Sequence, residues 1–72
     1  MKITLKDVSK SDAAAILRRA YEKDRSAVYG PGHTVYGTLV TVQYDNDARL
    51  VEVQSNALSR DSLREYLPQQ FG

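Results

Sequence analysis

The sequence predicts an α+β domain in which a three-stranded, mostly antiparallel sheet carries two helices on one face. Three observations predict it: alternation over residues 1–6, an apolar stripe at helical spacing behind it, and two alternating segments, 34–44 and 49–55, joined by a polar turn. A second helical segment follows. The predicted element order is β-α-β-β-α, and 72 residues are expected to form a single domain, residues 1–72.

The first strand and the first helix have clear signals. Met1, Ile3 and Leu5 alternate with polar residues, which is typical of a half-buried strand. Either Ser9 or Ser11 can cap the helix that follows, and Ser9 with Asp12 three residues later resembles a capping box. The apolar stripe comprises Ala13, Ile16, Leu17, Ala20 and Tyr21. Asp24 falls inside this stripe, so we expect the helix to fray there or Asp24 to find a partner. The Gly30-Pro31-Gly32 segment then breaks the chain.

The segments 34–44 and 49–55 are predicted to form a hairpin around Asn46-Asp47. This pairing sets Val42 opposite Val51 and Val40 opposite Val53, on one buried face, whereas a slip of one residue would oppose a valine to a glutamate. The other face of the sheet would have no helix to cover it. Its predicted members are Val35, Leu39, Thr41, Gln43, Leu50, Glu52, Gln54 and the lysines of the first strand.

The second helix is predicted to begin at Ser59, with Leu58 and Leu63 packing as a hydrophobic staple, and to stop at Pro68. Its inner stripe would be Leu63, Tyr66 and Leu67. A right-handed crossover through the first helix makes the first two strands parallel. The third strand can then lie between them, so the predicted sheet order is 1-3-2, with both helices on the valine face and the first strand at an edge.

Composition excludes several classes of protein. Ten basic and nine acidic residues give a net charge of +1, which argues against a strong electrostatic footprint for nucleic acid. The absence of cysteine removes disulfides and thiolate metal sites, and fits a cytoplasmic protein. No apolar run reaches membrane-spanning length, so we expect no membrane association. A core this small favours a partner subunit as the remaining way to add stability.

The residues do not predict catalysis. His33 is the only histidine, and no acid or nucleophile near it in the sequence would complete a site, so we interpret it as a solvated loop residue. Gly30-Pro31-Gly32 lacks the lysine and hydroxyl of a phosphate-binding loop, and proline removes an amide that such a loop would use. We therefore expect no enzyme, no cofactor and no metal site.

Arginines on the first helix are the candidates for nucleic-acid contact. Arg18, Arg19 and Arg25 would lie on its exposed side and could reach phosphates. Glu22 lies about one turn from each of them and partly neutralises the surface, which is also the pattern of an ordinary solvated helix face.

Tyrosine and leucine residues are the candidates for protein contact. Tyr29 and Tyr36 are expected at the rim of the core, where tyrosine is favoured in interfaces, although ordinary edge-of-core packing would also place them there. Leu39 and Leu50 are predicted on the uncovered sheet face. They would form either a homodimer contact or a docking surface for a different protein.

The predicted element order is similar to a ferredoxin-like half that lacks its last strand. It is also similar to the Phd/YefM family of antitoxins, chiefly over residues 40–67, with the polar turn Asp45-Asn46-Asp47 and the helix that opens at Ser59. This resemblance implies a dimeric DNA-binding regulator that uses the first-helix arginines. The composition and the missing site favour another function: a small non-enzymatic interaction protein that binds and occludes a larger macromolecule. Phage and mobile-element inhibitors of host defence, including anti-CRISPR-type proteins, belong to this class.

Overall fold

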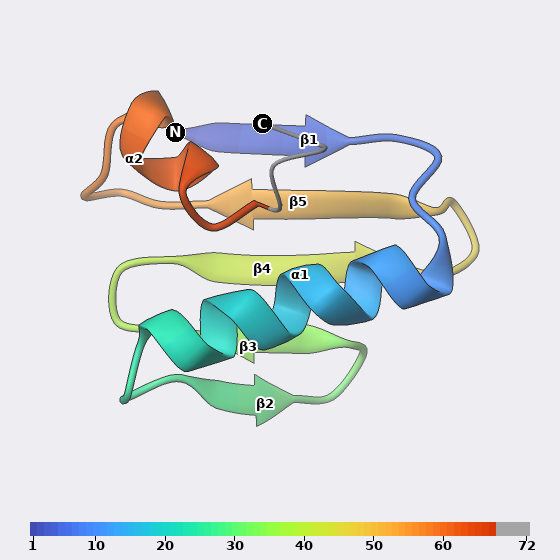
Figure 1. The fold of residues 1–72 in the computed structure, drawn as a ribbon, viewed down its shortest axis with the longest axis horizontal. Helices are drawn as coiled ribbons and strands as arrows, with labels where there is room; N and C mark the ends of the chain where they lie inside the picture. Colours follow the sequence, from blue (N-terminus) through green and yellow to red (C-terminus); the bar gives the residue numbers. More distant parts are fainter. Residues whose placement is uncertain (68–72) are drawn as a thin grey trace.

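The computed structural model describes residues 1–67 and contains five strands and two helices in that range. In chain order these elements are β1 (Lys2–Leu5), α1 (Lys10–Lys23), β2 (Val28–Gly30), β3 (Thr34–Tyr36), β4 (Thr41–Asp45), β5 (Leu50–Gln54) and α2 (Arg60–Arg64). The strands form one antiparallel sheet in the order β1-β5-β4-β3-β2 (Figure 1). The α+β class therefore holds, but the predicted three-stranded sheet of order 1-3-2 is wrong.

The segment 34–44 is two strands, and this is the main reason for the error. A two-residue turn at Thr38-Leu39 folds the chain back, and the amide of Gly37 donates to the Val40 carbonyl at 2.9 Å. On one continuous strand, Val35 and Val42 would face opposite ways because side chains alternate. Across the hairpin they are direct partners on the same face, so Val35 is in the core with 1% of its surface exposed.

Residues 28–30 form β2, a further strand that was not predicted. The Pro31-Gly32-His33 turn, in which Gly32 and His33 have φ of 72° and 53°, returns the chain so that β2 pairs with β3. From the sequence, Gly30-Pro31-Gly32 was expected only to break the chain. Three residues are too few to show alternation, so the pattern could not distinguish a short edge strand from a loop.

The β4–β5 hairpin has a different register from the predicted one. Val42 lies opposite Val53, two residues from the expected partner, because a four-residue loop, residues 46–49, connects the strands. The Asp45 carboxylate accepts hydrogen bonds from the amides of Asp47 and Ala48 in this loop. A two-residue shift leaves every side chain on its face. The predicted buried set is therefore confirmed: Val40, Val42, Val51, Val53, Ile16, Leu17, Leu63 and Leu67.

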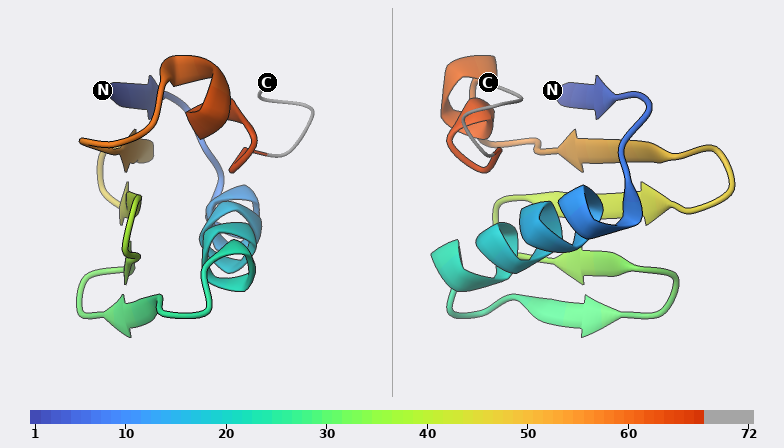
Figure 2. Two further views of the ribbon diagram at one scale, coloured as in Figure 1. Left: turned by 90° about the vertical axis from the view of Figure 1, so that its left-hand side faces the viewer. Right: turned by 45° about the vertical axis from the view of Figure 1, so that its right-hand side comes forward.

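Both helices lie over the same face of the sheet, α1 across its middle and α2 near β1 and β5 (Figure 2). Each begins as predicted: the Ser9 hydroxyl caps α1 by accepting from the Asp12 amide, and the Ser59 hydroxyl caps α2 by accepting from the Ser62 amide. The expected stop at Pro68 lies outside the described residues. Within residues 1–67, neither helix is long and apolar enough to cross a membrane.

Tyr21 is the exception among the predicted core positions of α1. It is 44% exposed, because it lies near the end of the helix and stacks on Tyr29 of β2 at a centroid distance of 4.7 Å. Tyr44 is buried, and its hydroxyl donates to the Val8 carbonyl at 3.0 Å, which satisfies the polar tip of an otherwise apolar side chain.

Candidate functional site

The candidate residues from the sequence lie in different parts of the fold. Arg18 and Arg19 are on α1, Arg25 is in the connection to β2, Tyr29 is on β2, Tyr36 is on β3, Leu39 is in the β3–β4 turn and Leu50 begins β5. Because Tyr29 pairs with core residue Val35, it lies on the helix side of the sheet, whereas Tyr36 lies on the open side.

The structure separates Leu39 from Leu50. Leu50 pairs with Asp45 at one end of β4, while Leu39 lies beyond Thr41 at the other end. Four residues of strand alone put about 13 Å between them. The open face between these ends is mainly polar, with two cross-strand rows: Tyr36, Thr41, Gln54 and Lys2, then Thr34, Gln43, Glu52 and Thr4. The two leucines therefore do not form one apolar face.

The three candidate arginines have different surroundings. The Arg19 Nε donates to the Glu65 carbonyl at 2.9 Å and so joins α1 to the end of α2. Lys23 lies over the ring of Tyr66, with its Nζ 5.3 Å from the centroid, and makes a second link of this kind. Arg18 and Arg25 are exposed. Part of the predicted basic surface thus holds the fold together.

The exposed apolar side chains gather around β2, β3 and the turn after them. Among residues 1–67, six large apolar side chains are exposed, and all but Met1 belong to this region: Tyr21, Val28, Tyr29, Tyr36 and Leu39, each between 44% and 59% exposed. Because exposed aliphatic and aromatic side chains contribute most when a partner buries them, this end of the sheet is the candidate binding region.

Leu39 lies on a turn that hydrogen bonds tie to the end of α1. We call residues 37–40 the Leu39 turn. The Asp24 carboxylate, just after α1, accepts hydrogen bonds from the Thr38 amide at 2.6 Å and the Thr38 hydroxyl at 2.7 Å. It also accepts from the Ser26 amide at 2.9 Å. One side chain therefore fixes both the exit of the helix and the Leu39 turn.

These hydrogen bonds have an electrostatic consequence. The Thr38 hydroxyl, then the amides of Thr38 and Ser26, stabilise the ionised Asp24 and hold the pKa of its carboxyl below the ordinary value of 3.8. The sequence signal was partly visible, since Asp24 interrupts an apolar stripe and was expected to mark fraying of the helix or to find a partner. The second alternative is confirmed, because Asp24 follows the last residue of α1 and accepts hydrogen bonds from Thr38 and Ser26. Thr38 and Gly37 were not identified as members of the site.

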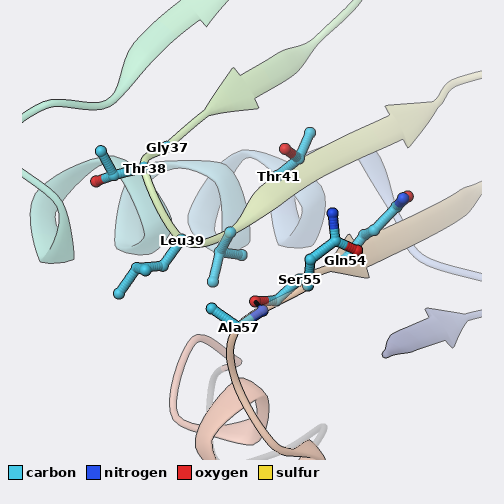
Figure 3. A pocket seen from close by; sticks show the side chains of 9 residues that line it. Gly37, Thr38, Leu39, Thr41, Gln54, Ser55 and Ala57 are labelled. Carbon is cyan, nitrogen blue, oxygen red and sulfur yellow. Dashed lines mark hydrogen bonds between the residues drawn. The ribbon is translucent and has the colours of Figure 1, made fainter.

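A groove adjoins the Leu39 turn. It has a volume of about 170 Å³ and lies between that turn and the connection from β5 to α2, with Leu39 and Thr38 on one side and Ser55 and Ala57 on the other (Figure 3). The far lip is also fixed, because the Ser55 hydroxyl accepts from the amides of Ala57 and Leu58, each at 3.0 Å. The groove has room for one ring-sized side chain of a partner.

His33 lies in the β2–β3 turn, with its ring centroid 6.3 Å from that of Tyr44 in an edge-on arrangement. Within residues 1–67, no group of three or more histidine, cysteine, aspartate or glutamate side chains is placed to hold a metal ion.

The Asp24 contact predicts a pH-dependent contribution to stability. Asp24→Asn should lower the melting temperature at neutral pH, because the amide loses the charge that strengthens the bonds to Thr38. Since the pKa of Asp24 is depressed, its stabilising effect is fully present above pH 3.8 and is lost as the pH falls through the lower folded-state pKa. Melting curves of the two proteins should therefore converge below pH 3.8.

Asp47→Asn is the matched control, because it removes an exposed carboxylate from the β4–β5 loop. We expect it to melt like the wild type throughout. A stability difference for Asp24→Asn that persists unchanged at the lowest pH would contradict the assigned role of the carboxylate.

No protein-family model, curated protein or solved structure matches this chain. The element order on which the resemblance to Phd/YefM antitoxins rested also differs from the observed order, because β2 and β3 are additional strands. Function therefore has to be argued from the geometry of the chain itself.

Proposed function

We propose that this chain is a small non-enzymatic interaction protein that docks on a larger protein through the Leu39 turn and its adjoining groove, and thereby occludes a surface of that partner. The observation that carries the proposal is Leu39 itself. Its side chain is 49% exposed, yet it lies on a turn that Asp24 fixes through Thr38.

Fixing the turn supports a binding role for a physical reason. An ordered loop loses less conformational entropy when it binds, so more of the contact energy is available as affinity. An apolar side chain held in this way can act as an anchor that inserts into a partner. The groove beside it supplies the complementary feature, since it can receive a side chain from the partner. Tyr36, 50% exposed on the neighbouring strand, extends the contact area.

The proposed biological class is an inhibitor from a phage or mobile element that acts on host defence, of the anti-CRISPR type, working in the cytoplasm. Inhibition by occupying a surface requires a rigid small domain with an anchor, and it needs no catalytic group. The support for this class is the exposed Leu39 side chain on a turn that Asp24 holds through Thr38.

Site-specific crosslinking tests the docking surface. A photoreactive phenylalanine analogue at position 39 should crosslink to one host protein, whereas the same group at position 46, in the β4–β5 loop, should not. Leu39→Ser should lower the amount of this protein that the chain retains by at least about tenfold, as loss of an anchor side chain implies. Leu39→Met keeps an apolar side chain of similar volume, so it should retain the partner. Equal retention by the serine variant would overturn the proposal.

A salt titration distinguishes this function from an antitoxin-like regulator that binds DNA as a dimer through α1. Binding carried by phosphate contacts weakens steeply as salt rises, whereas binding carried by Leu39 and Tyr36 depends on salt much less. Arg18→Ala is the informative variant, because Arg18 is an exposed arginine of α1, while Arg19 is engaged with the Glu65 carbonyl. Steep salt dependence combined with loss of duplex binding in Arg18→Ala would favour the regulator.

A further inference from the structure

At the outer edge of β2, a single residue of the described chain, Tyr29, has both a backbone amide and a carbonyl free to pair with another strand. Within residues 1–67, β2 is the last strand on its side of the sheet (Figure 1). The Tyr44 amide donates a hydrogen bond to the His33 carbonyl. Because backbone groups alternate in direction along a strand, Val35, two residues further on, also directs its backbone hydrogen bonds toward β4. By the alternation of antiparallel ladders, Val28 and Gly30 then direct their backbone groups toward β3, and the amide and carbonyl of Tyr29 point outward.

Side chains flank this edge on both faces. On the helix face, the ring of Tyr29 stacks on Tyr21 with an interplanar angle of 28°. On the open face, Val28 is 59% exposed. Gly30 has no side chain, and the ring of Tyr36 lies over it, so closely that a Cβ on Gly30 would overlap the ring. The open side of the edge therefore presents a projecting valine and, two residues further on, the ring of Tyr36, which covers Gly30.

We propose that a second copy of this chain occupies the β2 edge, in an antiparallel pairing about a two-fold axis that sets Tyr29 opposite Tyr29 of the other copy. The two residues would exchange a pair of amide-to-carbonyl hydrogen bonds. Val28 of each copy then lies opposite Gly30 of the other, so the valine side chain packs on the ring of Tyr36 that covers Gly30. The Tyr21–Tyr29 stacks of the two copies become neighbours on the helix face.

Self-complementarity is the reason to assign a second copy to this edge. A symmetric interface uses one patch twice, so each side chain must meet a suitable contact from the same patch. Val28 and the ring over Gly30 satisfy this requirement, because Val28 and Gly30 are equally spaced on either side of Tyr29. The three residues are also uncharged, so the axis brings no like charges together.

The register is limited to this one arrangement. Pro31 has no amide to donate, and the amide of Ala27 already donates to the Asp24 carbonyl at 3.0 Å. The ladder therefore cannot extend past Tyr29 in either direction or shift along the strand. The other edge of the sheet is unsuitable, because pairing β1 strands about Thr4 would set Lys2 opposite Lys6 of the other copy.

The contact is small, so we expect a weak dimer whose population depends on concentration. It leaves the Leu39 turn accessible on both copies, since that turn lies beyond β3 and is not part of the β2 edge. The inference therefore goes beyond the proposed function and does not depend on it.

Sedimentation equilibrium from micromolar to millimolar concentration tests the dimer. The wild type should rise from 8.1 kDa toward twice that mass. Val28→Glu should raise the dissociation constant by at least about tenfold, because two carboxylates would enter a desolvated contact. Thr4→Glu, on the open face of the opposite edge strand, is the matched control and should dimerise like the wild type.

A second variant tests the backbone hydrogen bonds of Tyr29. Tyr29→Pro removes the outward amide, which edge strands tolerate, and should abolish association, while Tyr29→Phe should retain it. Circular dichroism establishes that each variant is folded. A wild type that stays at 8.1 kDa overturns the inference, as does a dimer insensitive to both Val28→Glu and Tyr29→Pro. A monomer that still crosslinks through position 39 would overturn the dimer while leaving the proposed function intact.

Discussion

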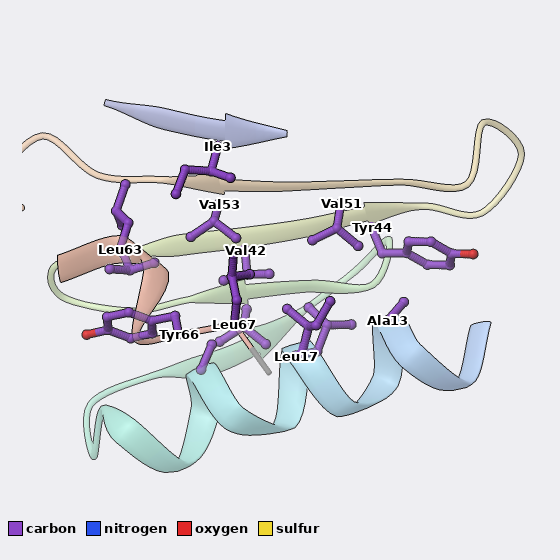
Figure 4. Close-up of a cluster of buried hydrophobic side chains, with 14 of the residues drawn as sticks. Ile3, Ala13, Leu17, Val42, Tyr44, Val51, Val53, Leu63, Tyr66 and Leu67 are labelled. Atoms are coloured by element: carbon purple, nitrogen blue, oxygen red, sulfur yellow. The ribbon is translucent and has the colours of Figure 1, made fainter. Parts of the chain in front are cut away.

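Val42→Asp is expected to abolish folding. Val42 has 0% of its surface exposed and lies at the middle of the sheet, directly between its cross-strand partners Val35 and Val53. Figure 4 shows its side chain, with that of Val53, inside the apolar cluster. A buried unpaired carboxylate costs several kcal/mol, whether it stays charged or takes up a proton. A domain of this size has only about 5–15 kcal/mol of net stability, at the lower end when the core is small.

Gln43→Asp is the matched control for this substitution. Gln43 is the next residue of β4 and is exposed on the open face, so the same side chain enters water instead of the core. We expect its free energy of unfolding to fall by only about 1 kcal/mol or less, because the new carboxylate lies opposite Glu52 but remains in water. Far-UV circular dichroism and thermal melts would measure both. A cooperative melt for Val42→Asp at the wild-type temperature would show that the two faces of the sheet are assigned the wrong way round.

The buried face could be predicted because alternation tolerates an error in register. The sequence pattern placed Val42 opposite Val51, and the structure places it opposite Val53. A shift of two residues changes the partners and leaves the faces unchanged. The helix starts were predictable for a different reason. Ser9 and Ser59 act through hydrogen bonds that span three residues, so their signals are local.

The number of strands could not be predicted because it depends on contacts that are distant in the sequence. Gly37 lies within an alternating segment, and nothing near it shows that the chain reverses there. The reversal is held by Asp24, which is 14 residues away from Thr38 in the chain. Once the segment is divided, Val35 moves from the open face to the core and the predicted apolar face is lost.

Two of the residues singled out from the sequence, Leu39 and Tyr36, belong to the candidate site, and their role in binding stays a prediction. Leu39 and Tyr36 are exposed, yet Leu39 belongs to a turn and not to a strand face. Arg19 illustrates a limit of sequence patterns, because its acceptor is a backbone carbonyl 46 residues away. A backbone carbonyl is present at every residue, so no residue type marks this one as an acceptor.

Gly37→Ala is expected to destabilise the domain by about 1–3 kcal/mol, the usual cost of forcing an extra carbon into a filled space. A Cβ at position 37 would lie 2.6 Å from the Asp24 Oδ2 and 2.8 Å from the Val40 carbonyl oxygen. The second of these atoms is backbone and belongs to the turn itself, so it cannot move away without opening the bond between the Gly37 amide and the Val40 carbonyl. The Asp24 Oδ2 is the acceptor that holds Thr38. The substitution therefore weakens both sets of hydrogen bonds that hold the Leu39 turn.

Gly30→Ala gives the comparison that makes this test specific. Its added Cβ would meet only the ring of Tyr36 within close range, and a half-exposed ring can swing outward, so the stability loss should be smaller. Urea unfolding would rank the two variants, and the amide resonance of Thr38 would report the turn, which should shift in Gly37→Ala alone. If the proposed function is correct, Gly37→Ala should also reduce crosslinking from position 39 while the domain remains folded, because the anchor is then no longer held in one place. Equal stability losses for the two glycines, with an unshifted Thr38 amide, would mean that the Leu39 turn is not held by the contact between Asp24 and Thr38.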